Sequence, residues 1–203
     1  MPPAGVPRRA ISANEYADLP RELVTLEYWE ALPETSEWHI EVVEGALLTT
    51  PPPPFWRQRV AYRAAHLIDE QFGGHGAFAR GEMLLEHRPL TVRVPDVVVV
   101  PWEILETNPQ RVQAEDVLLV VEVLSEGTKR TDQITKHSEY AAAGIRQYWI
   151  IDVEAPVSMI TYRLLDGRYE TAGEYSGKVK LGVSGHPIVL DLDKLIAPRP
   201  SRL

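Results

Sequence analysis

Two apolar segments of this chain each carry one carboxylate within a run of residues typical of buried strands. Asp96 follows Pro95 and precedes a run of valines, and Glu122 lies inside the segment from Val117 to Leu124. A carboxylate in such a run is costly to desolvate unless it binds a cation, meets hydrogen-bond donors or lies at a water-filled edge. Two carboxylates of this kind indicate a shared site, since one strand, a short connection and a neighbouring strand fit between them.

The chemistry that this pair favours is the binding of a hard divalent cation. Asp96 and Glu122, side by side on adjacent strands, would form an all-oxygen, doubly negative site of the kind that Mg²⁺ or Mn²⁺ prefers. The chain has no cysteine, which excludes a thiolate centre and a disulfide framework. Its histidines show no spacing typical of zinc ligands. The alternative is that both carboxylates cap turns or pair with arginines such as Arg93.

Size and charge limit the possible functions. The chain has 203 residues and a formal net charge of −8, so we expect a single domain, 1–203, with a flexible tail over 1–13. The acidic balance weighs against a protein that coats nucleic acid, but not against a nuclease, whose metal ligands are themselves acidic. No apolar stretch approaches the roughly 20 residues that span a bilayer. We expect a cytoplasmic protein with no membrane partner.

The hydrophobic pattern predicts an α/β fold of mixed type, with α+β character. Strand, helix and strand over 117–152 predict a parallel pair joined by a crossover. In the first half of the chain we expect short helices within 16–32, a strand from Trp38 with a turn at Glu44 and Gly45, an extended connector over 51–54, an amphipathic helix over 60–72, and a hairpin of two strands over 78–86 and 90–100. In the second half we expect a strand over 117–124, a helix over 129–143 ended by Gly144, and a strand over 147–152. An antiparallel hairpin over 157–175, turning at Asp166 and Gly167, and a final strand or short helix over 188–196 follow.

The combined spacing resembles the Uma-two family of restriction-endonuclease-like proteins, within the PD-(D/E)XK nuclease superfamily. The matching features are Pro95-Asp96, the segment from Glu122 to Ser125, the positions Thr128, Asp132, Lys136 and Tyr140 at intervals of four, and the segment from Gly144 to Asp152. The resemblance implies a nuclease-like core over 38–165, with a restriction-endonuclease-like mixed β-sheet flanked by helices. It further implies Asp96 and Glu122 as metal ligands, DNA as substrate and a homodimer.

The expected catalytic lysine departs from the superfamily motif. Leu124 stands where that motif has lysine, and the Uma-two pattern places a lysine on the following helix, at the position of Lys136. Asp132, Lys136 and Tyr140 form one stripe of this helix. We expect Lys136 at the edge of an apolar side that includes Ile134, with its ammonium hydrated and its stem reaching the strand ends. The alternative is an exposed ion pair with Asp132 that only supports the helix.

Further charged residues are candidates for the same site. Glu41 matches an acidic position in the family's first strand and would add a third carboxylate, and Glu82 is another candidate; either one is also explained as part of a solvated face. Arg57, Arg59 and Arg63 would contact DNA phosphates from one helix face, or form a solvated basic face. The family often has a histidine just after the proline-rich connector, where this chain has arginines.

Three functions remain open from the sequence. The first is a Mg²⁺- or Mn²⁺-dependent endonuclease acting on DNA, with Asp96, Glu122 and Lys136 as its catalytic residues. The second is a non-catalytic binding or assembly module on the same fold, which the missing motif lysine favours. The third is a metal-free, glycosidase-like hydrolase in which Trp38, Trp56 or Trp102 stacks on sugars.

Overall fold

A six-stranded mixed sheet forms the centre of the protein. The computed structural model describes residues 23–32, 39–72, 75–124 and 131–198. The strand order is β11-β10-β9-β8-β6-β3, and only the β8–β9 pair is parallel. The bounds are β3 (His75–Ala79), β6 (Val97–Pro101), β8 (Leu119–Val123), β9 (Gln147–Asp152), β10 (Ser158–Leu165) and β11 (Arg168–Ser176).

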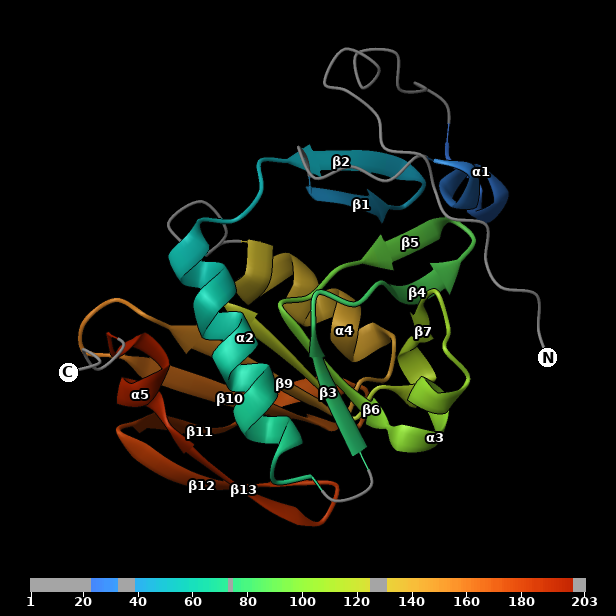
Figure 1. Cartoon of the computed structure of the whole chain (residues 1–203). Helices are drawn as coiled ribbons and strands as arrows, with labels where there is room; N and C mark the ends of the chain where they lie inside the picture. Colours follow the sequence, from blue (N-terminus) through green and yellow to red (C-terminus); the bar gives the residue numbers. More distant parts are fainter. Residues whose placement is uncertain (1–22, 33–38, 73–74, 125–130, 199–203) are drawn as a thin grey trace.

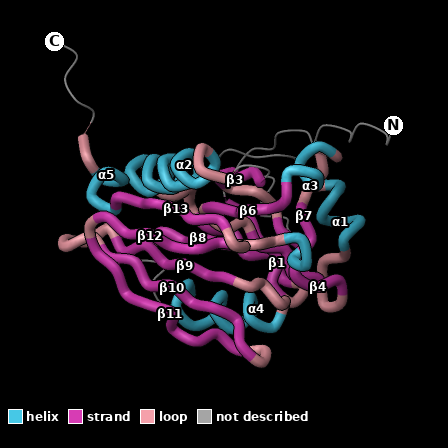
Figure 2. Tube along the Cα trace, turned by 90° about the horizontal axis from the view of Figure 1, so that it is seen from below, coloured by secondary structure: helices cyan, strands magenta, loops and turns pink. Residues whose placement is uncertain are grey.

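Helices cover both faces of this sheet. In Figures 1 and 2, α2 (Phe55–Asp69) and α5 (Leu192–Ile196) lie on one face, and α4 (His137–Ala142) lies on the other. Successive strand residues alternate between the two sides: Val97 and Val99 join the core that contains α2, whereas Val98 and Val100 join the core that contains α4. Burial on both faces explains why these strands are almost continuously apolar.

A second mixed sheet of five strands stands beside the first, with α1 (Leu26–Ala31) packed against it. Its order is β2-β1-β5-β4-β7, in which β4 and β7 are parallel. The bounds are β1 (His39–Val43), β2 (Ala46–Thr50), β4 (Met83–His87), β5 (Leu90–Arg93) and β7 (Val112–Gln113). The remaining elements are the short helices α3 (Trp102–Glu106) and η2 (Ala114–Asp116), the π-helical stretch η3 (Thr131–Lys136) before α4, and the hairpin of β12 (Lys178–Val183) and β13 (His186–Asp191).

The two long strands expected over 78–86 and 90–100 are each broken in the structure. Only their inner parts, β4 and β5, form the expected hairpin, while β3 and β6 pair with each other in the six-stranded sheet. Pro95 has no N–H with which to continue the β5 ladder, and Arg80 adopts a positive φ of 62°. The chain therefore crosses from one sheet to the other on either side of this hairpin, and Asp96 lies at one of the crossings.

Most other expectations about the fold are confirmed. The fold is mixed, β8 and β9 are parallel, and β10 and β11 form the hairpin that turns at Asp166 and Gly167. Gly144 follows α4 with a φ of 81°, a conformation that glycine adopts at little cost at a helix end. The final segment contains both a strand, β13, and a helix, α5.

Some expectations fall on residues that the structure does not describe. These are the tail over 1–13, Trp38, Thr128 and the beginning of the helix expected from 129. Within the described ranges, no helix has both the length and the apolar character needed to cross a membrane.

Candidate active site

Asp96 lies where the chain leaves β5 and enters β6, at the junction between the two sheets. Its Oδ2 atom accepts hydrogen bonds from Arg57 Nε at 3.0 Å and from Arg57 Nη2 at 2.7 Å. The backbone N–H of Val123, on β8, donates to the same oxygen at 2.8 Å. Asp96 is therefore fixed between the first turn of α2 and the neighbouring strand, although it lies outside any ladder.

Glu122 lies on β8 and points to the α4 face, because its neighbours Val121 and Val123 face the α2 core. Its side chain is fully buried. Lys136 Nζ lies 2.7 Å from its Oε1, and the Tyr140 hydroxyl donates to the same oxygen at 2.9 Å. The other oxygen, Oε2, has no hydrogen-bond donor in the described part of the chain and lies 3.6 Å from Arg57 Nη2. Asp96 and Glu122 thus converge on one guanidinium.

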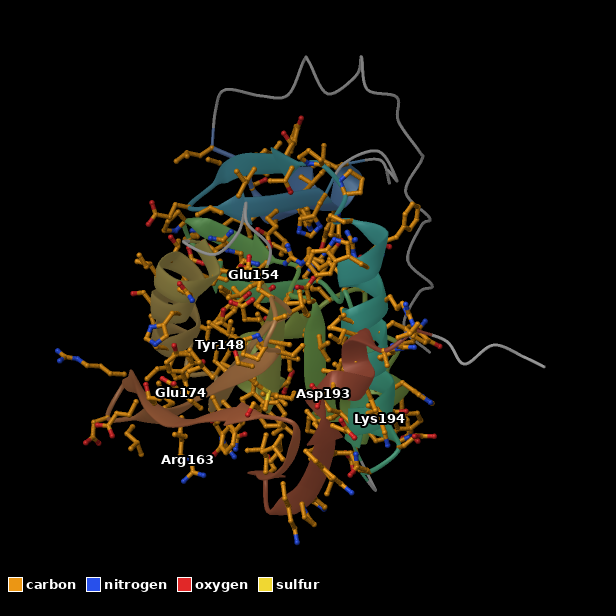
Figure 3. All side chains as sticks on the ribbon, turned by 90° about the vertical axis from the view of Figure 1, so that its left-hand side faces the viewer. Tyr148, Glu154, Arg163, Glu174, Asp193 and Lys194 are labelled. Carbon is orange, nitrogen blue, oxygen red and sulfur yellow. The ribbon has the colours of Figure 1, made fainter. Side chains whose placement is uncertain are left out.

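The position of Lys136 corrects the expectation of a hydrated ammonium. Lys136, Asp132 and Tyr140 form one stripe, as predicted, but all three are buried, with Lys136 only 5% exposed, and Ile134, expected on the apolar side, is 61% exposed. The stripe faces the sheet, and the helix that carries it begins with a π-helical stretch, η3 (Thr131–Lys136). Tyr148 supports this stretch from β9, where its hydroxyl donates to the Asp132 carbonyl at 2.9 Å (Figure 3).

A second buried ion cluster adjoins the first. Arg93 donates through Nη1 to Glu41 at 2.8 Å and through Nε and Nη2 to both oxygens of Glu139, also at 2.8 Å. The backbone N–H of Val94 donates to the remaining Glu41 oxygen at 2.9 Å. Lys136 Nζ links the two clusters, since it lies 3.7 Å from Glu41 Oε1 as well as beside Glu122.

The pKa shifts follow from burial and from neighbouring charges. Burial raises the pKa of Glu122, and the carboxylates of Asp132 and Asp96 raise it further, against the opposing effects of Lys136 and Arg57. Burial would lower the pKa of Lys136, but the carboxylates of Glu122, Glu41 and Asp132 outweigh it and raise that pKa above its ordinary value. The ammonium is therefore charged, and it lies against a carboxylate that is reluctant to ionise.

Carboxylates outnumber cations among the described residues of the two clusters and the helix that links them. When every group is ionised, three cations face five carboxylates among the residues that the structure describes. These residues are Arg57, Arg93 and Lys136 on one side and Glu41, Asp96, Glu122, Asp132 and Glu139 on the other. An all-oxygen donor set and the unbonded Oε2 of Glu122 fit a hard divalent cation. Within the described ranges, no three side chains of the metal-ligating types lie close enough together to hold such an ion as they stand.

A cleft of about 480 Å³ opens onto this site. The connector Pro51–Pro54 and part of β2 form its apolar wall. Its polar lining consists of His39, Glu41, Arg57, Arg80, Asp96, Asp132 and Lys136. Glu122 does not line the cleft, so a solute that enters meets Arg57, Asp96 and Lys136 first.

Other candidates lie away from the site. Glu82 accepts a hydrogen bond from the Trp29 indole at 3.1 Å and does not line the cleft. Arg59 and Arg63 donate to backbone carbonyls at the end of α5, among them that of Ala197 at 2.5 and 2.7 Å. Figure 3 shows α5, with Lys194 on it, alongside α2. Both arginines thus stabilise a helix end, while Arg57 alone of the three arginines reaches the carboxylates.

Sequence reasoning missed part of the site. It did not place Arg57 against Asp96, although the family's histidine position was a signal that this residue faces the site. It also did not assign Glu139 or Arg80, whose surroundings depend on which strands cross between the sheets. Of the tryptophans considered for sugar stacking, Trp56 and Trp102 do not line the cleft.

Comparison with known proteins places the chain in a family. A family profile described as "Putative restriction endonuclease" matches residues 26–187, which is most of the sequence. The chain belongs to the Uma2 family. This confirms the resemblance drawn from the motifs, and the match extends beyond the expected core on both sides. A comparison with curated proteins gave no match.

A solved structure from Anabaena variabilis ATCC 29413 has the same fold as this Uma2 protein. That protein is described as a "putative nuclease belonging to DUF820". The two chains share 20% identity with a TM-score of 0.65, over 85% of this chain and 97% of the other. At this level of identity the likeness shows the fold alone, which agrees with a nuclease-like arrangement of mixed sheets flanked by helices.

Proposed function

We propose that this Uma2 protein is a Mg²⁺- or Mn²⁺-dependent endonuclease of the PD-(D/E)XK type that hydrolyses phosphodiester bonds in DNA. The observation that carries the proposal is the convergence of Asp96 and Glu122 on one cation, the Arg57 guanidinium, with Glu122 Oε2 left unbonded. A site that holds one cation between two carboxylates has the donors for a divalent ion. Membership of a family described as "Putative restriction endonuclease" supports the same reaction class.

Each side chain then has a defined task. Asp96 and Glu122 would hold the metal, which when bound would activate water and offset charge on the leaving oxygen. Lys136, charged and buried, would stabilise the negative charge that develops on the phosphate. Tyr140 fixes Glu122 through its hydroxyl, and so keeps one carboxylate oxygen oriented. This arrangement explains how the chain can function with leucine at position 124, because a lysine from the helix reaches the same glutamate.

Three cationic side chains line the cleft beside its carboxylates, and these cations would contact a phosphate backbone. Arg80 is exposed at the cleft and lies 3.0 Å from the ring of His39. Arg57 and Lys136 add positive charge at the inner end. Such donors suit phosphate oxygens, for which guanidinium groups are geometrically matched.

The test combines metal binding with cleavage. Mn²⁺ is titrated calorimetrically into wild type and Asp96→Asn, and both are assayed on supercoiled plasmid with Mg²⁺, with Mn²⁺ and with a chelator. We expect wild type to bind and cleave, and Asp96→Asn to do neither. Asp166→Asn is the matched control, because it makes the same change at an exposed turn residue with a φ of 48°, which asparagine tolerates. Metal-dependent cleavage by Asp96→Asn at the wild-type rate would refute the assignment.

A second candidate function is a non-catalytic binding module on the nuclease fold. It has support of its own, because Arg57 and Lys136 already engage the two carboxylates. Absence of Mn²⁺ binding by wild type, together with absence of cleavage, would favour this module.

We also propose that the protein acts as a homodimer, since two sites related by a two-fold axis suit the cutting of two DNA strands. Light scattering coupled to size-exclusion chromatography measures the mass directly. A monomer with full cleavage activity would contradict the dimer but leave the metal site unaffected.

A further inference from the structure

Arg57 does not lie on an open helix face, where a phosphate contact or a solvated basic residue would be expected. It lies in the first turn of α2, is 8% exposed, and places its guanidinium against Asp96 and Glu122 together. Its Nη2 atom lies 2.7 Å from Asp96 Oδ2 and 3.6 Å from Glu122 Oε2. The contacts differ in kind, because the first is a hydrogen bond and the second only a close approach.

The oxygen atoms that Arg57 faces are those that a shared metal would need. The opposite oxygen of Glu122 is held by Lys136 and Tyr140, whereas Oε2 lacks a hydrogen-bond donor within the described ranges. A guanidinium and a divalent ion in the same space repel each other strongly, since the site is shielded from water. Binding of the metal between these oxygens therefore requires Arg57 to move.

The cleft provides a place to which Arg57 can move. Arg57 lines the cleft while Glu122 does not, so the guanidinium lies on the route from the cleft to Glu122. An arginine stem is long and has several rotatable bonds, which lets the head turn toward solvent without displacing α2.

We infer that Arg57 is a resident counter-cation, which holds the metal position in the metal-free protein and yields it when a divalent ion binds. The inference rests on the proposed function, because it concerns the same pair of carboxylates. It implies that Arg57 lowers metal affinity: part of the binding free energy is spent in separating the guanidinium from Asp96.

The test is a calorimetric titration of Mn²⁺ into the full chain, carried out on wild type, Arg57→Gln and Arg59→Gln. Arg59→Gln is the matched control, because it removes the same charge two positions further along α2. The Arg59 side chain donates to the Ala197 carbonyl and not to Asp96. We expect Arg57→Gln to bind Mn²⁺ more tightly by about tenfold, within the usual range of coupling between two sites. Arg59→Gln should bind as wild type does.

A second measurement removes the dependence on how the variant folds. In wild-type protein labelled with ¹⁵N, the Arg57 Nε–H signal is assigned by its loss in Arg57→Gln and followed during titration with Mg²⁺. We expect this signal to shift as Asp96 is released, while the Arg59 signal stays in place. A signal unchanged at saturating Mg²⁺ would overturn the inference.

The outcomes separate this inference from the proposed function. Equal or weaker binding by Arg57→Gln, with wild-type binding lost in Asp96→Asn, would show that Arg57 positions the carboxylates for the metal, and only the inference would fail. Binding by Arg57→Gln without binding by wild type would support it in its strongest form. Binding by neither protein would overturn both.

Discussion

The two buried ion clusters at the junction of the sheets differ in how fully their hydrogen bonds are satisfied. In the Arg93 cluster, which consists of Glu41, Arg93 and Glu139, every carboxylate oxygen receives a hydrogen bond. In the Arg57 cluster, which consists of Arg57, Asp96 and Glu122, three donors crowd onto one Asp96 oxygen while Glu122 Oε2 receives none among the described residues.

We propose that this difference separates a structural ion network from a site kept for a ligand. A buried charge without its hydrogen bonds destabilises the fold, so an unsatisfied oxygen in a native core calls for a further partner. Both clusters lie at the same junction and adjoin Lys136, so their position does not explain the difference. Their burial differs mainly at one member, since the Glu139 side chain is 22% exposed whereas Glu122 is fully buried. On the arrangement of their donors, we propose that the Arg93 cluster holds the sheets together and that the Arg57 cluster carries the chemistry.

The largest effect that this comparison predicts is on stability. Arg93→Met removes the common cation of the buried Glu41 and the partly exposed Glu139, and we expect the free energy of unfolding to fall by about 3–5 kcal/mol. Urea denaturation followed by tryptophan fluorescence measures it. Arg168→Met, at an exposed position on β11, is the control. A loss for Arg93→Met no larger than that of the control would erase the distinction between the clusters.

The next effect concerns Lys136, the link between the clusters. Lys136→Met removes the charge that would stabilise the reacting phosphate, and we expect plasmid cleavage at saturating Mg²⁺ to slow by about 10²- to 10³-fold. Mn²⁺ affinity should persist, because Asp96 and Glu122 remain. Lys194→Met, which changes a solvent-exposed lysine on α5, should cleave at the wild-type rate. Loss of metal binding along with activity would instead make Lys136 a support for the carboxylates.

The smallest effect is a pH dependence that belongs to the Arg93 cluster. Burial alone would raise the pKa of Glu41, but Lys136, His39 and Arg93 hold it well below the ordinary value of 4.5. A depressed carboxyl pKa adds stability above pH 4.5, and that stability is lost as the pH falls further. In Glu41→Gln the acid loss should be shallower by up to about 1.4 kcal/mol per pH unit.

Urea denaturation of both proteins at a series of acidic pH values measures this slope. Glu174→Gln, an exposed change on β11, should follow the wild-type curve. If the Glu41→Gln curve also runs parallel to wild type, the Glu41 carboxyl contributes no linked proton and the Arg93 cluster is weaker than its hydrogen bonds indicate.

Much of the fold followed from local pattern. The parallel β8–β9 pair and the hairpin at Asp166 and Gly167 were predictable because each depends on periodicity and turn residues within a short segment. The strands on either side of Pro95 were not, because a valine-rich run reads as one strand whichever sheet its ends join. The run is divided because β5, before Pro95, pairs in the five-stranded sheet and β6, after it, pairs in the six-stranded sheet.

By itself the sequence determined the composition of the site: two carboxylates on neighbouring strands, and a lysine four residues from an aspartate on the helix that follows. The tertiary structure decided the charge environment. It buried Lys136 against Glu122, placed Arg57 beside Asp96, and left one glutamate oxygen unbonded among the described residues. Residues far apart in the chain make these contacts, and their distances depend on where the two sheets meet. No local pattern encodes that position.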